Sequence, residues 1–320
     1  MTTKLIRGHG QLWLSIVVLA TLFNGNDIWA RTVMNALNTP SNLSGAHIQN
    51  HFITVNGLRV HYVEFGKGRT VVLIHGNAGS VEDFEFGAFD FLSPGYRVVA
   101  IDRPGHGRSD RPPGNSAVEF QAALLHQTLS QLGIFQPILV GHSWGAALAL
   151  AYALRYPADV SAMILLAPAA YPDESSEGFL PFTTKIPLIG DLSVVLGRAL
   201  LGHRLLRAGL TRAFYPSPIS DRYLKFVDSL WLGRKQIKAY VEDEATLNDS
   251  LRKLSIRYSE INIPVVIVTG DKDRIVSPDQ NARALHAAIR DSRLIEMKDT
   301  GHEIPQTHPE SIGLALKMIS

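Results

Sequence analysis

A serine stands at the centre of a motif that suits nucleophilic chemistry. The segment 141–145 reads Gly-His-Ser-Trp-Gly, so Ser143 has a glycine two residues before it and another two residues after it. An apolar run at 137–140 precedes the motif, and an alanine-rich run at 146–154 follows it. A tight turn from a strand into a helix needs small residues at both glycine positions and projects the serine hydroxyl clear of the sheet. This context predicts that Ser143 is a nucleophile.

A serine hydroxyl needs a base to take its proton, and histidine is the side chain whose pKa suits that role near neutral pH. Of the 12 histidines, His302 lies in a Gly-His pair just after the last predicted strand, 293–297. Loops after parallel strands gather at one edge of a sheet, so we expect His302 at the same edge as Ser143. His302 is therefore the predicted base.

A carboxylate is needed to orient that imidazole. Asp271 and Asp273 both follow the predicted strand 264–268 and the glycine after it. Asp271 comes directly after the glycine, where an Asp side chain commonly bonds the backbone of its own turn. Asp273 lies two residues further into the loop, which favours it as the orienting acid.

The oxyanion formed when the serine attacks must be met by preorganised N–H groups. The backbone amide of Trp144 directly follows the nucleophile at a predicted helix N-terminus, where amides point outward. The segment 75–79 reads His-Gly-Asn-Ala-Gly and follows the predicted strand 70–74. We expect the amide of Asn77 in this loop to supply the second donor of the oxyanion hole.

The elements that must position these residues alternate along the chain. Two alternating stretches between His51 and Phe65 flank Asn56-Gly57, which predicts an antiparallel hairpin. Six short apolar runs bounded by Gly, Pro or Asp predict buried parallel strands. These runs are 70–74, 96–101, 137–140, 162–166, 264–268 and 293–297, and helical patterns lie at 81–92, 117–132, 144–156, 278–289 and 308–319. The alternation predicts an α/β fold with a mostly parallel eight-stranded sheet and helices on both faces.

The alternation stops for nearly a hundred residues between strands 162–166 and 264–268. This interval has helical patterns, for example at 192–210 and 230–254, and no convincing strand. It predicts an inserted helical lid. We therefore expect a core made of residues 47–170 and 263–320, and a helical cap made of residues 171–262.

The N-terminal segment has the features of a targeting sequence. Two basic residues precede the apolar run 12–23, and polar residues follow it. The run is shorter than the ~20 residues that span a bilayer and within the ~7–15 of a secretory signal. Cleavage after Ala30 places the bulky Ile28 where a small residue is usual, so retention as an anchor stays open. Residues 1–46 are thus predicted to be a signal peptide or membrane anchor plus linker. The protein is then exported or held at a membrane by its N-terminus; a cytoplasmic location is the alternative.

Composition narrows the chemistry further. The 320 residues are 46% hydrophobic and 19% charged, which is typical of a folded globular protein. Lys and Arg number 31 against 29 Asp and Glu, and a net charge of +2 does not indicate a nucleic-acid partner. The absence of cysteine excludes disulfides, thiolate metal sites and a cysteine nucleophile. Since the sequence also lacks HExxH, GxxxxGK[ST] and GxGxxG motifs, we expect no metal and no nucleotide cofactor.

These motifs together resemble those of the α/β-hydrolase superfamily, in the serine-nucleophile branch with a helical cap. The resemblance covers about residues 48–320 and includes the Asp-Arg-Pro-Gly-His-Gly-Arg-Ser run at 102–109. It implies the chain order serine, acid, histidine and a cofactor-independent hydrolase. It also implies that Asp273 is the acid, because Asp273 stands three residues after the strand-ending glycine and shortly before the apolar pair 275–276. Asp173 stays an alternative, since some relatives carry the acid in that earlier loop.

The resemblance leaves the reaction open, because the superfamily cleaves carboxyl esters, lactones, amides, C–C bonds, epoxides and carbon–halogen bonds. Haloalkane dehalogenases have a similar Asn and Trp pair, but they and epoxide hydrolases attack with an aspartate where this chain has Ser143. An alkylated serine would be an ether that this machinery could not open. A small, apolar carboxylic ester or lactone is the favoured substrate. A C–C bond or amide/peptide hydrolase on the same residues, and a non-catalytic binding protein, remain alternatives. Nothing in the sequence predicts the oligomeric state.

Overall fold

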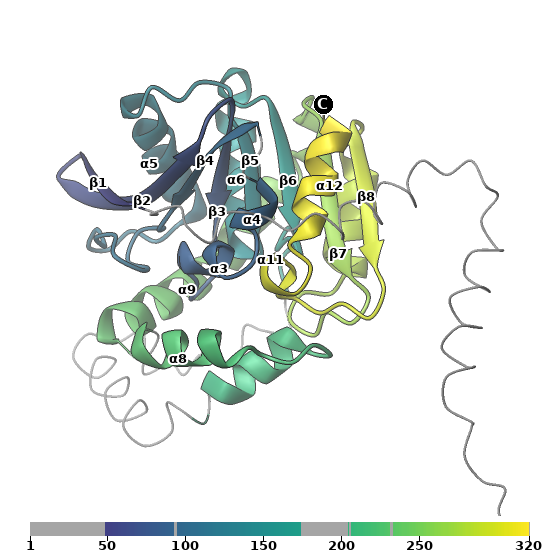
Figure 1. The fold of residues 1–320 in the computed structure, drawn as a ribbon. Coiled ribbons are helices and arrows are strands. Elements are labelled where there is room, and N and C mark those ends of the chain that lie inside the picture. The colour runs from purple at the N-terminus through teal and green to yellow at the C-terminus, as the bar shows by residue number, and fades with distance from the viewer. Residues whose placement is uncertain (1–48, 93–94, 174–203, 205, 231–232, 320) are drawn as a thin grey trace, which may run out of the picture. The chain divides into compact units, whose positions relative to one another are not determined.

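The computed structural model describes residues 49–92, 95–173, 204, 206–230 and 233–319 (Figure 1). Eight strands form one sheet in the order β1-β2-β4-β3-β5-β6-β7-β8. They are β1 (Gln49–Val55), β2 (Leu58–Gly66), β3 (Arg69–Ile74), β4 (Tyr96–Ile101), β5 (Ile138–His142), β6 (Ala162–Leu166), β7 (Val265–Gly270) and β8 (Ser292–Met297). Strand β2 is antiparallel to β1 and β4, and every other pair is parallel. The predicted fold class is confirmed.

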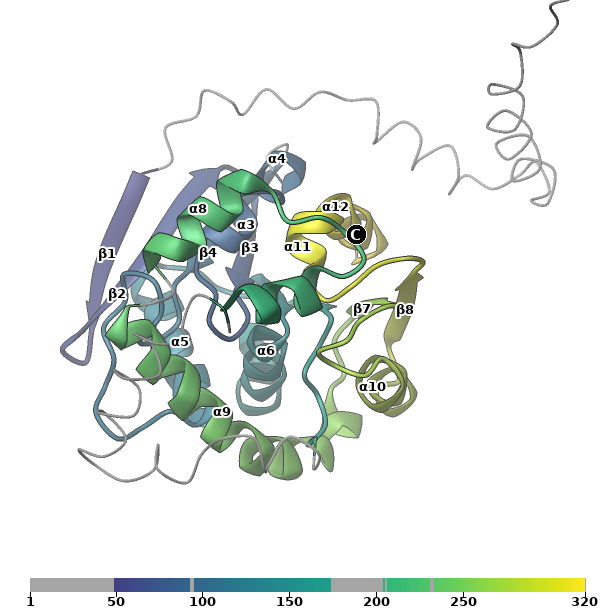
Figure 2. The ribbon, with the colours of Figure 1, turned by 90° about the horizontal axis from the view of Figure 1, so that it is seen from below.

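Helices cover both faces of this sheet (Figure 2). They are α3 (Glu82–Glu85), α4 (Phe89–Leu92), α5 (Val118–Gln131), α6 (Trp144–Arg155), η1 (Pro157–Asp159), α8 (Asp221–Leu230), α9 (Arg234–Ser255), η3 (Tyr258–Glu260), η4 (Asp279–Arg283), α10 (Ala284–Ala288), α11 (Ile304–Thr307) and α12 (Glu310–Ile319). Buried residues of α3, α4, α11 and α12 belong to one core cluster, and those of α5, α6 and α10 to the other.

The central strands are buried on both faces, which explains why they are continuous apolar runs. In β3, Val71 and Leu73 belong to the core cluster beneath α4 and α12. Val72 and Ile74 belong to the opposite cluster, beneath α5 and α6. Successive strand side chains point to opposite faces, so a strand between two helical layers needs an apolar residue at every position. Burial of each such side chain contributes about 1.5–3 kcal/mol.

The hairpin that opens the sheet forms as its turn residues predict. Val55 of β1 pairs with Leu58 of β2, which leaves only two residues in the turn. Both have positive φ angles, 51° at Asn56 and 78° at Gly57. A two-residue hairpin turn of this kind favours Asn-Gly, because these residues tolerate the left-handed region best.

Two of the predicted helices differ in the structure. The predicted helix 81–92 is two short helices, α3 and α4, which separate at Gly87. A Cβ atom on Gly87 would lie 2.7 Å from the backbone oxygen of Pro305, so a close contact with another segment fixes this break. The predicted helix 278–289 begins with a π-helical stretch, η4, before it continues as α10.

The described part of the inserted segment is mainly helical and contains no strand. Residues 206–214 form helical turns, and α8 and the longer α9 follow them. The helical turns at 206–214 and helix α8 pack together through a cluster of buried side chains: Leu210, Ala213, Phe214, Tyr223 and Val227. Residues 174–203, 205 and 231–232 of the predicted cap, and the predicted targeting segment 1–46, lie outside the described residues. Within the described ranges, no helix combines the length and apolar character that crossing a bilayer requires.

Candidate active site

The serine motif forms the tight strand-to-helix turn that its sequence predicts. Ser143 lies between β5 and α6 with φ 53° and ψ −116°, a conformation that costs a non-glycine residue about 1–3 kcal/mol. Both motif glycines face backbone at very short range. A Cβ atom on Gly141 would lie 2.7 Å from the Cα of Ala146, and one on Gly145 would collide with the carbonyl oxygen of Ile74. The small residues are therefore required by close packing around the turn.

The predicted acid and base contact each other directly. His302 Nδ1 and Asp273 Oδ2 are 2.8 Å apart. The other carboxylate oxygen, Oδ1, accepts hydrogen bonds from the backbone N–H groups of Ile275 and Val276 at 2.8 and 2.9 Å. The side chain of Asp273 is fully buried, and that of His302 is 5% exposed. These contacts fix the imidazole so that Nε2 is the nitrogen left for chemistry.

The same contacts determine how the pair ionises. Burial alone would raise the pKa of the Asp273 carboxyl, but His302 and the backbone amides of Val276 and Ile275 hold that pKa below its ordinary value. Burial alone would lower the pKa of His302, but Asp273 and Glu303 outweigh it and hold the pKa of the imidazole above 6.5. Asp273 is therefore charged at neutral pH and stabilises the protonated imidazole.

The rival acids make other contacts. Asp271 binds the Lys272 ammonium at 2.9 Å and accepts a hydrogen bond at 3.4 Å from the backbone N–H of Thr300, which lies in the histidine loop and not in the turn of Asp271 itself. The backbone of Asp173 exchanges hydrogen bonds with the Asn248 side chain. His302 Nδ1 bonds Asp273 and neither of these two residues.

The residue before the serine links the nucleophile turn to the histidine loop. The rings of His142 and His302 have centroids 4.9 Å apart. His142 Nε2 lies 2.9 Å from the backbone oxygen of His302. Burial, and then the nearby His302, lowers the pKa of His142 to about 3, so His142 is neutral and its Nε2–H donates to that oxygen. Among the described residues, no hydrogen bond joins the Ser143 hydroxyl to His302 itself.

The predicted oxyanion loop lies beside the turn of Ser143. A Cβ atom on Gly76 would lie 3.3 Å from the Cβ of Ser143, which places this loop against the nucleophile. Ala78 has a positive φ of 58°, so the loop bends sharply after Asn77. Neither the backbone N–H of Asn77 nor that of Trp144 donates a hydrogen bond to another group in the described part of the chain. Both amides are therefore free to bind an oxyanion.

The side chain of Asn77 is fully occupied. Its amide Nδ2 donates to Glu244 Oε1 at 2.6 Å and to the backbone oxygen of Tyr240 at 3.2 Å, both on helix α9. Its oxygen accepts hydrogen bonds from the N–H of Ala78 at 3.0 Å and from Arg103 at 3.4 Å. An amide group has two N–H donors, so none remains for a halide or a substrate.

A buried ion cluster connects the cap to the core, and the sequence analysis did not identify it. Asp243 of α9 is fully buried and accepts hydrogen bonds from four side chains. The donors are Arg103 at 2.6 Å, Arg111 at 2.8 Å, His106 at 3.0 Å and Gln121 at 3.1 Å. Burial alone would raise the pKa of Asp243, but Arg103, His106 and Arg111 hold it well below its ordinary value. The sequence sign of this cluster is the run at 102–109, which resembles a landmark of the family and contains Arg103 and His106.

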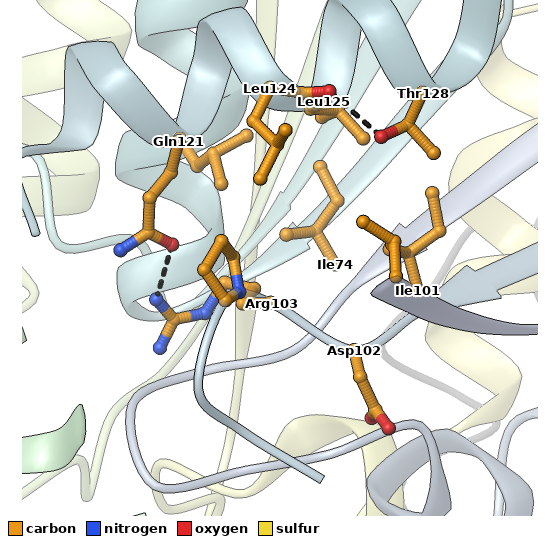
Figure 3. A pocket seen from close by; sticks show the side chains of 11 residues that line it. Ile74, Ile101, Asp102, Arg103, Gln121, Leu124, Leu125 and Thr128 are labelled. Carbon is orange, nitrogen blue, oxygen red and sulfur yellow. Dashed lines mark hydrogen bonds between the residues drawn. The ribbon is translucent and has the colours of Figure 1, made fainter. Parts of the chain in front are cut away.

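Arg103 also holds both predicted halves of the oxyanion hole. It is 2% exposed, and its guanidinium donates to the backbone oxygens of His75 and Gly76 at 3.2 and 3.1 Å. The guanidinium carbon lies 3.9 Å from the ring centroid of Trp144, a close cation–π contact. Figure 3 shows the Gln121 carboxamide turned toward the same guanidinium. Arg103 is thus buried, and it contacts both the oxyanion loop and the Trp144 ring from the protein interior.

A small cavity lies beside Arg103, on the side of helix α5 (Figure 3). Its walls are mainly apolar side chains: Val60, Ile74, Ile101, Leu124, Leu125 and Leu148. None of the predicted site residues, Ser143, Asp273, His302, Asn77 and Trp144, lines it. This cavity is therefore separate from the candidate active site.

Comparisons with known proteins agree with this fold. Residues 69–309 match the family model described as the alpha/beta hydrolase fold. The AB hydrolase superfamily protein YisY of Bacillus subtilis is 28% identical over 272 residues, which cover 84% of this chain and 98% of YisY. The 2-hydroxy-6-oxononadienedioate/2-hydroxy-6-oxononatrienedioate hydrolase of Paraburkholderia phymatum is 30% identical over 240 residues, or 71% of this chain and 78% of that protein.

A solved structure extends the similarity to the backbone. Cfl2 from Burkholderia cenocepacia is 26% identical with a TM-score of 0.69, and the match covers 85% of this chain and 95% of Cfl2. The family match spans more than half of the chain, including the serine turn and the histidine loop. The chain therefore belongs to the alpha/beta hydrolase fold family.

Proposed function

We propose that this protein is a serine hydrolase that cleaves small, apolar carboxylic esters or lactones through an acyl-enzyme intermediate. The observation that carries the proposal is the buried His302–Asp273 hydrogen bond of 2.8 Å, on a loop that His142 joins to the turn of a serine held at positive φ. A nucleophile on a strained turn and an imidazole oriented by a carboxylate are the two parts that acyl transfer requires.

In the proposed reaction, Ser143 Oγ attacks the acyl carbon while His302 Nε2 takes the hydroxyl proton. The backbone amides of Asn77 and Trp144 bind the oxyanion. The tetrahedral intermediate then collapses to the acyl-enzyme, and His302 gives its proton to the leaving alcohol. In the second half, His302 removes a proton from water, which attacks the acyl carbon. The second tetrahedral intermediate then collapses, the bond from the acyl carbon to Ser143 Oγ breaks, and His302 returns the proton to Oγ as the acid is released. Asp273 accepts a hydrogen bond from His302 Nδ1–H throughout.

Two features support a neutral substrate. The Arg103 guanidinium is 2% exposed and bound to Asp243, so it cannot pair with a substrate carboxylate. The carboxyl of Glu303 acts electrostatically on His302; burial raises its pKa, and in its charged form it would repel an anionic group beside the base. The occupied side chain of Asn77 also argues against the halide-binding role that the sequence pattern resembles.

A second candidate is hydrolysis of a C–C bond. The relative that is 30% identical is named for a 2-hydroxy-6-oxo dioate, a substrate class with no ester, whose hydrolysis breaks a C–C bond. The same serine, histidine and aspartate could serve this reaction. An amide or peptide hydrolase uses them in the same way.

A substrate panel distinguishes these candidates. It compares p-nitrophenyl esters of graded chain length with lactones, amino-acid amides and a 2-hydroxy-6-oxo dioate. We expect kcat/KM to be highest for a short neutral ester or a lactone, and the Ser143→Ala variant to lose turnover by a factor on the order of 10⁶. Preference for the dioate would replace the ester proposal with the C–C proposal. Absence of turnover on the whole panel, in folded protein, would favour a binding function.

A further inference from the structure

Helix α9 of the cap makes direct contact with the oxyanion loop at several points. Gln236 Nε2 donates to the backbone oxygens of Ala78 and Gly79 at 3.1 and 3.2 Å. Two turns further along, Glu244 accepts a hydrogen bond from the side chain of Asn77 at 2.6 Å. The preceding residue, Asp243, holds the arginine that supports the same loop from the core. The loop is thus held between α9 and Arg103.

The loop needs this support, because its conformation is unfavourable in isolation. Ala78 has a φ of 58°, a region that a non-glycine residue adopts only when its surroundings fix it. Both backbone polar groups of Ala78 are hydrogen-bonded. Its N–H donates to Asn77 Oδ1, and its carbonyl oxygen accepts a hydrogen bond from Gln236. An Asn77 side chain without a partner on α9 would be free to rotate and release the Ala78 N–H. The direction of the Asn77 backbone amide would then no longer be fixed.

We propose that cap helix α9 completes the oxyanion hole and that the Glu244 side chain, together with the backbone oxygen of Tyr240, positions Asn77. The inference rests on the proposed function, since Asn77 is an oxyanion donor only if an oxyanion forms. Glu244 acts through the side chain of Asn77 and touches no reacting atom. The cap is then a fixed part of the catalytic site, and catalytic competence requires α9 to be docked on the core.

The histidine loop is held by the cap in a similar way, which supports the same view. The N–H of His302 donates to the backbone oxygen of Ala213 at 3.0 Å. A Cβ atom on Gly301 would collide with the backbone oxygen of Tyr215, so the residue before the base must be a glycine for the cap to dock here. Cap residues therefore contact the loops that carry both the base and the oxyanion donor.

The test compares Glu244→Ala with Glu244→Gln and with Asp249→Asn. Alanine removes the closer of the two acceptors of the Asn77 side-chain amide and leaves the backbone oxygen of Tyr240, whereas glutamine keeps a carbonyl oxygen that can accept the same hydrogen bond. Asp249 is an exposed carboxylate on the same helix that pairs with Arg252, so Asp249→Asn is a matched loss of charge away from the loop. The readouts are kcat per titrated active site, KM, and the inhibition constant of a phenylboronic acid, whose serine adduct mimics the tetrahedral intermediate.

We expect Glu244→Ala to lower kcat by about ten- to a hundredfold, since loss of a whole oxyanion donor costs roughly 10²–10³. In Glu244→Ala, KM should change less than threefold, and the inhibition constant of the boronate should rise by the same factor as kcat/KM falls. In Glu244→Gln, most of the activity should be retained. A purely structural role would lower the titrated active fraction and leave kcat per active site unchanged. That result, or an equal loss in Asp249→Asn, overturns the positioning role. If the wild type itself hydrolyses no ester, the proposed function fails instead.

Discussion

The ionisation of His302 is the property of a single residue on which the proposed chemistry depends most. Burial opposes the charged imidazole, but Asp273 and Glu303 outweigh burial and hold the pKa of His302 above 6.5. His302 can accept the serine proton only when its Nε2 is unprotonated. Activity is therefore expected to be present above this raised pKa and to be lost as the pH falls through it.

Glu303→Gln tests the contribution of the second carboxylate. Removing a negative charge near His302 destabilises the imidazolium, so the acid limb of kcat/KM should move to lower pH. The measurement is the pH profile with a neutral ester, beside the control Glu296→Gln, which neutralises an exposed carboxylate paired with Arg283. An acid limb that stays in place in Glu303→Gln would contradict the electrostatic account of His302.

Asp273→Asn tests the orienting acid. Asparagine can present an N–H to the imidazole and favour the wrong tautomer, so we expect kcat to fall by up to about 10⁴. Asp271→Asn is the matched control in the same loop, because Asp271 is exposed and bonded to Lys272. It should retain kcat within about threefold. The reverse result, with Asp271→Asn inactive and Asp273→Asn near wild type, would reassign the acid.

At the scale of elements, the turn between β5 and α6 depends on two glycines that leave no room for a side chain. In Gly145→Ala the new methyl group would meet the backbone oxygens of Ile74 and His75, the latter at the start of the oxyanion loop. Overpacking of this kind costs about 1–3 kcal/mol. We expect a lower melting temperature and reduced kcat.

The control for that variant is Gly209→Ala, in the cap helical turns at 206–214. An added Cβ at Gly209 would have no heavy atom within 4 Å, and alanine favours a helix over glycine by about 1 kcal/mol. Its melting temperature should stay the same or rise. Thermal denaturation of the wild type, Gly145→Ala and Gly209→Ala checks both expectations. A Gly145→Ala variant with the same melting temperature as Gly209→Ala would contradict the packing argument.

The sequence predicted the elements of this sheet well because their signals are local. A parallel strand buried on both faces is a continuous apolar run, and Asn56-Gly57 specifies its own turn. The bond from His302 to Asp273 could also be anticipated, because the carboxyl ends of parallel strands share one edge of the sheet. The catalytic roles of these residues remain predictions.

Other features depend on contacts between distant segments, which periodicity does not reveal. The break at Gly87 arises where its backbone meets Pro305, more than two hundred residues later in the chain. The bond between Asn77 and Glu244 depends on how α9 docks on the core. Asp243 lies in the acidic run 242–244, a pattern typical of a solvated helix face, yet it is buried and accepts hydrogen bonds from four side chains. Such contacts follow from tertiary packing.

At the scale of the whole molecule, the described parts of the cap and the core share one continuous polar network. Breaking a buried, hydrogen-bonded ion pair such as Arg103–Asp243 typically costs 3–5 kcal/mol, because the remaining charge stays buried without its partner. Undocking of α9 would separate these charges from their partners, and it would also remove the contacts that hold the oxyanion loop. Stability and catalysis are therefore expected to depend on the same junction.

The N-terminal segment bears on where the whole molecule works. We propose that residues 1–46 direct the protein out of the cytoplasm, because the basic start and the apolar run at 12–23 fit a secretory signal or anchor. A reporter enzyme that is active only outside the cytoplasm should therefore be active when fused after residue 46. An expressed but inactive fusion would place the protein in the cytoplasm.

The account rests centrally on Ser143 as the nucleophile of a competent site. The most direct measurement is labelling of the purified, folded protein with a fluorophosphonate probe, followed by mass spectrometry of the modified peptide. The account predicts a single adduct on Ser143, because within the described ranges this is the one hydroxyl residue at positive φ, and the ring of the preceding His142 packs against that of His302. An unlabelled folded protein, or an adduct on another residue, would contradict it.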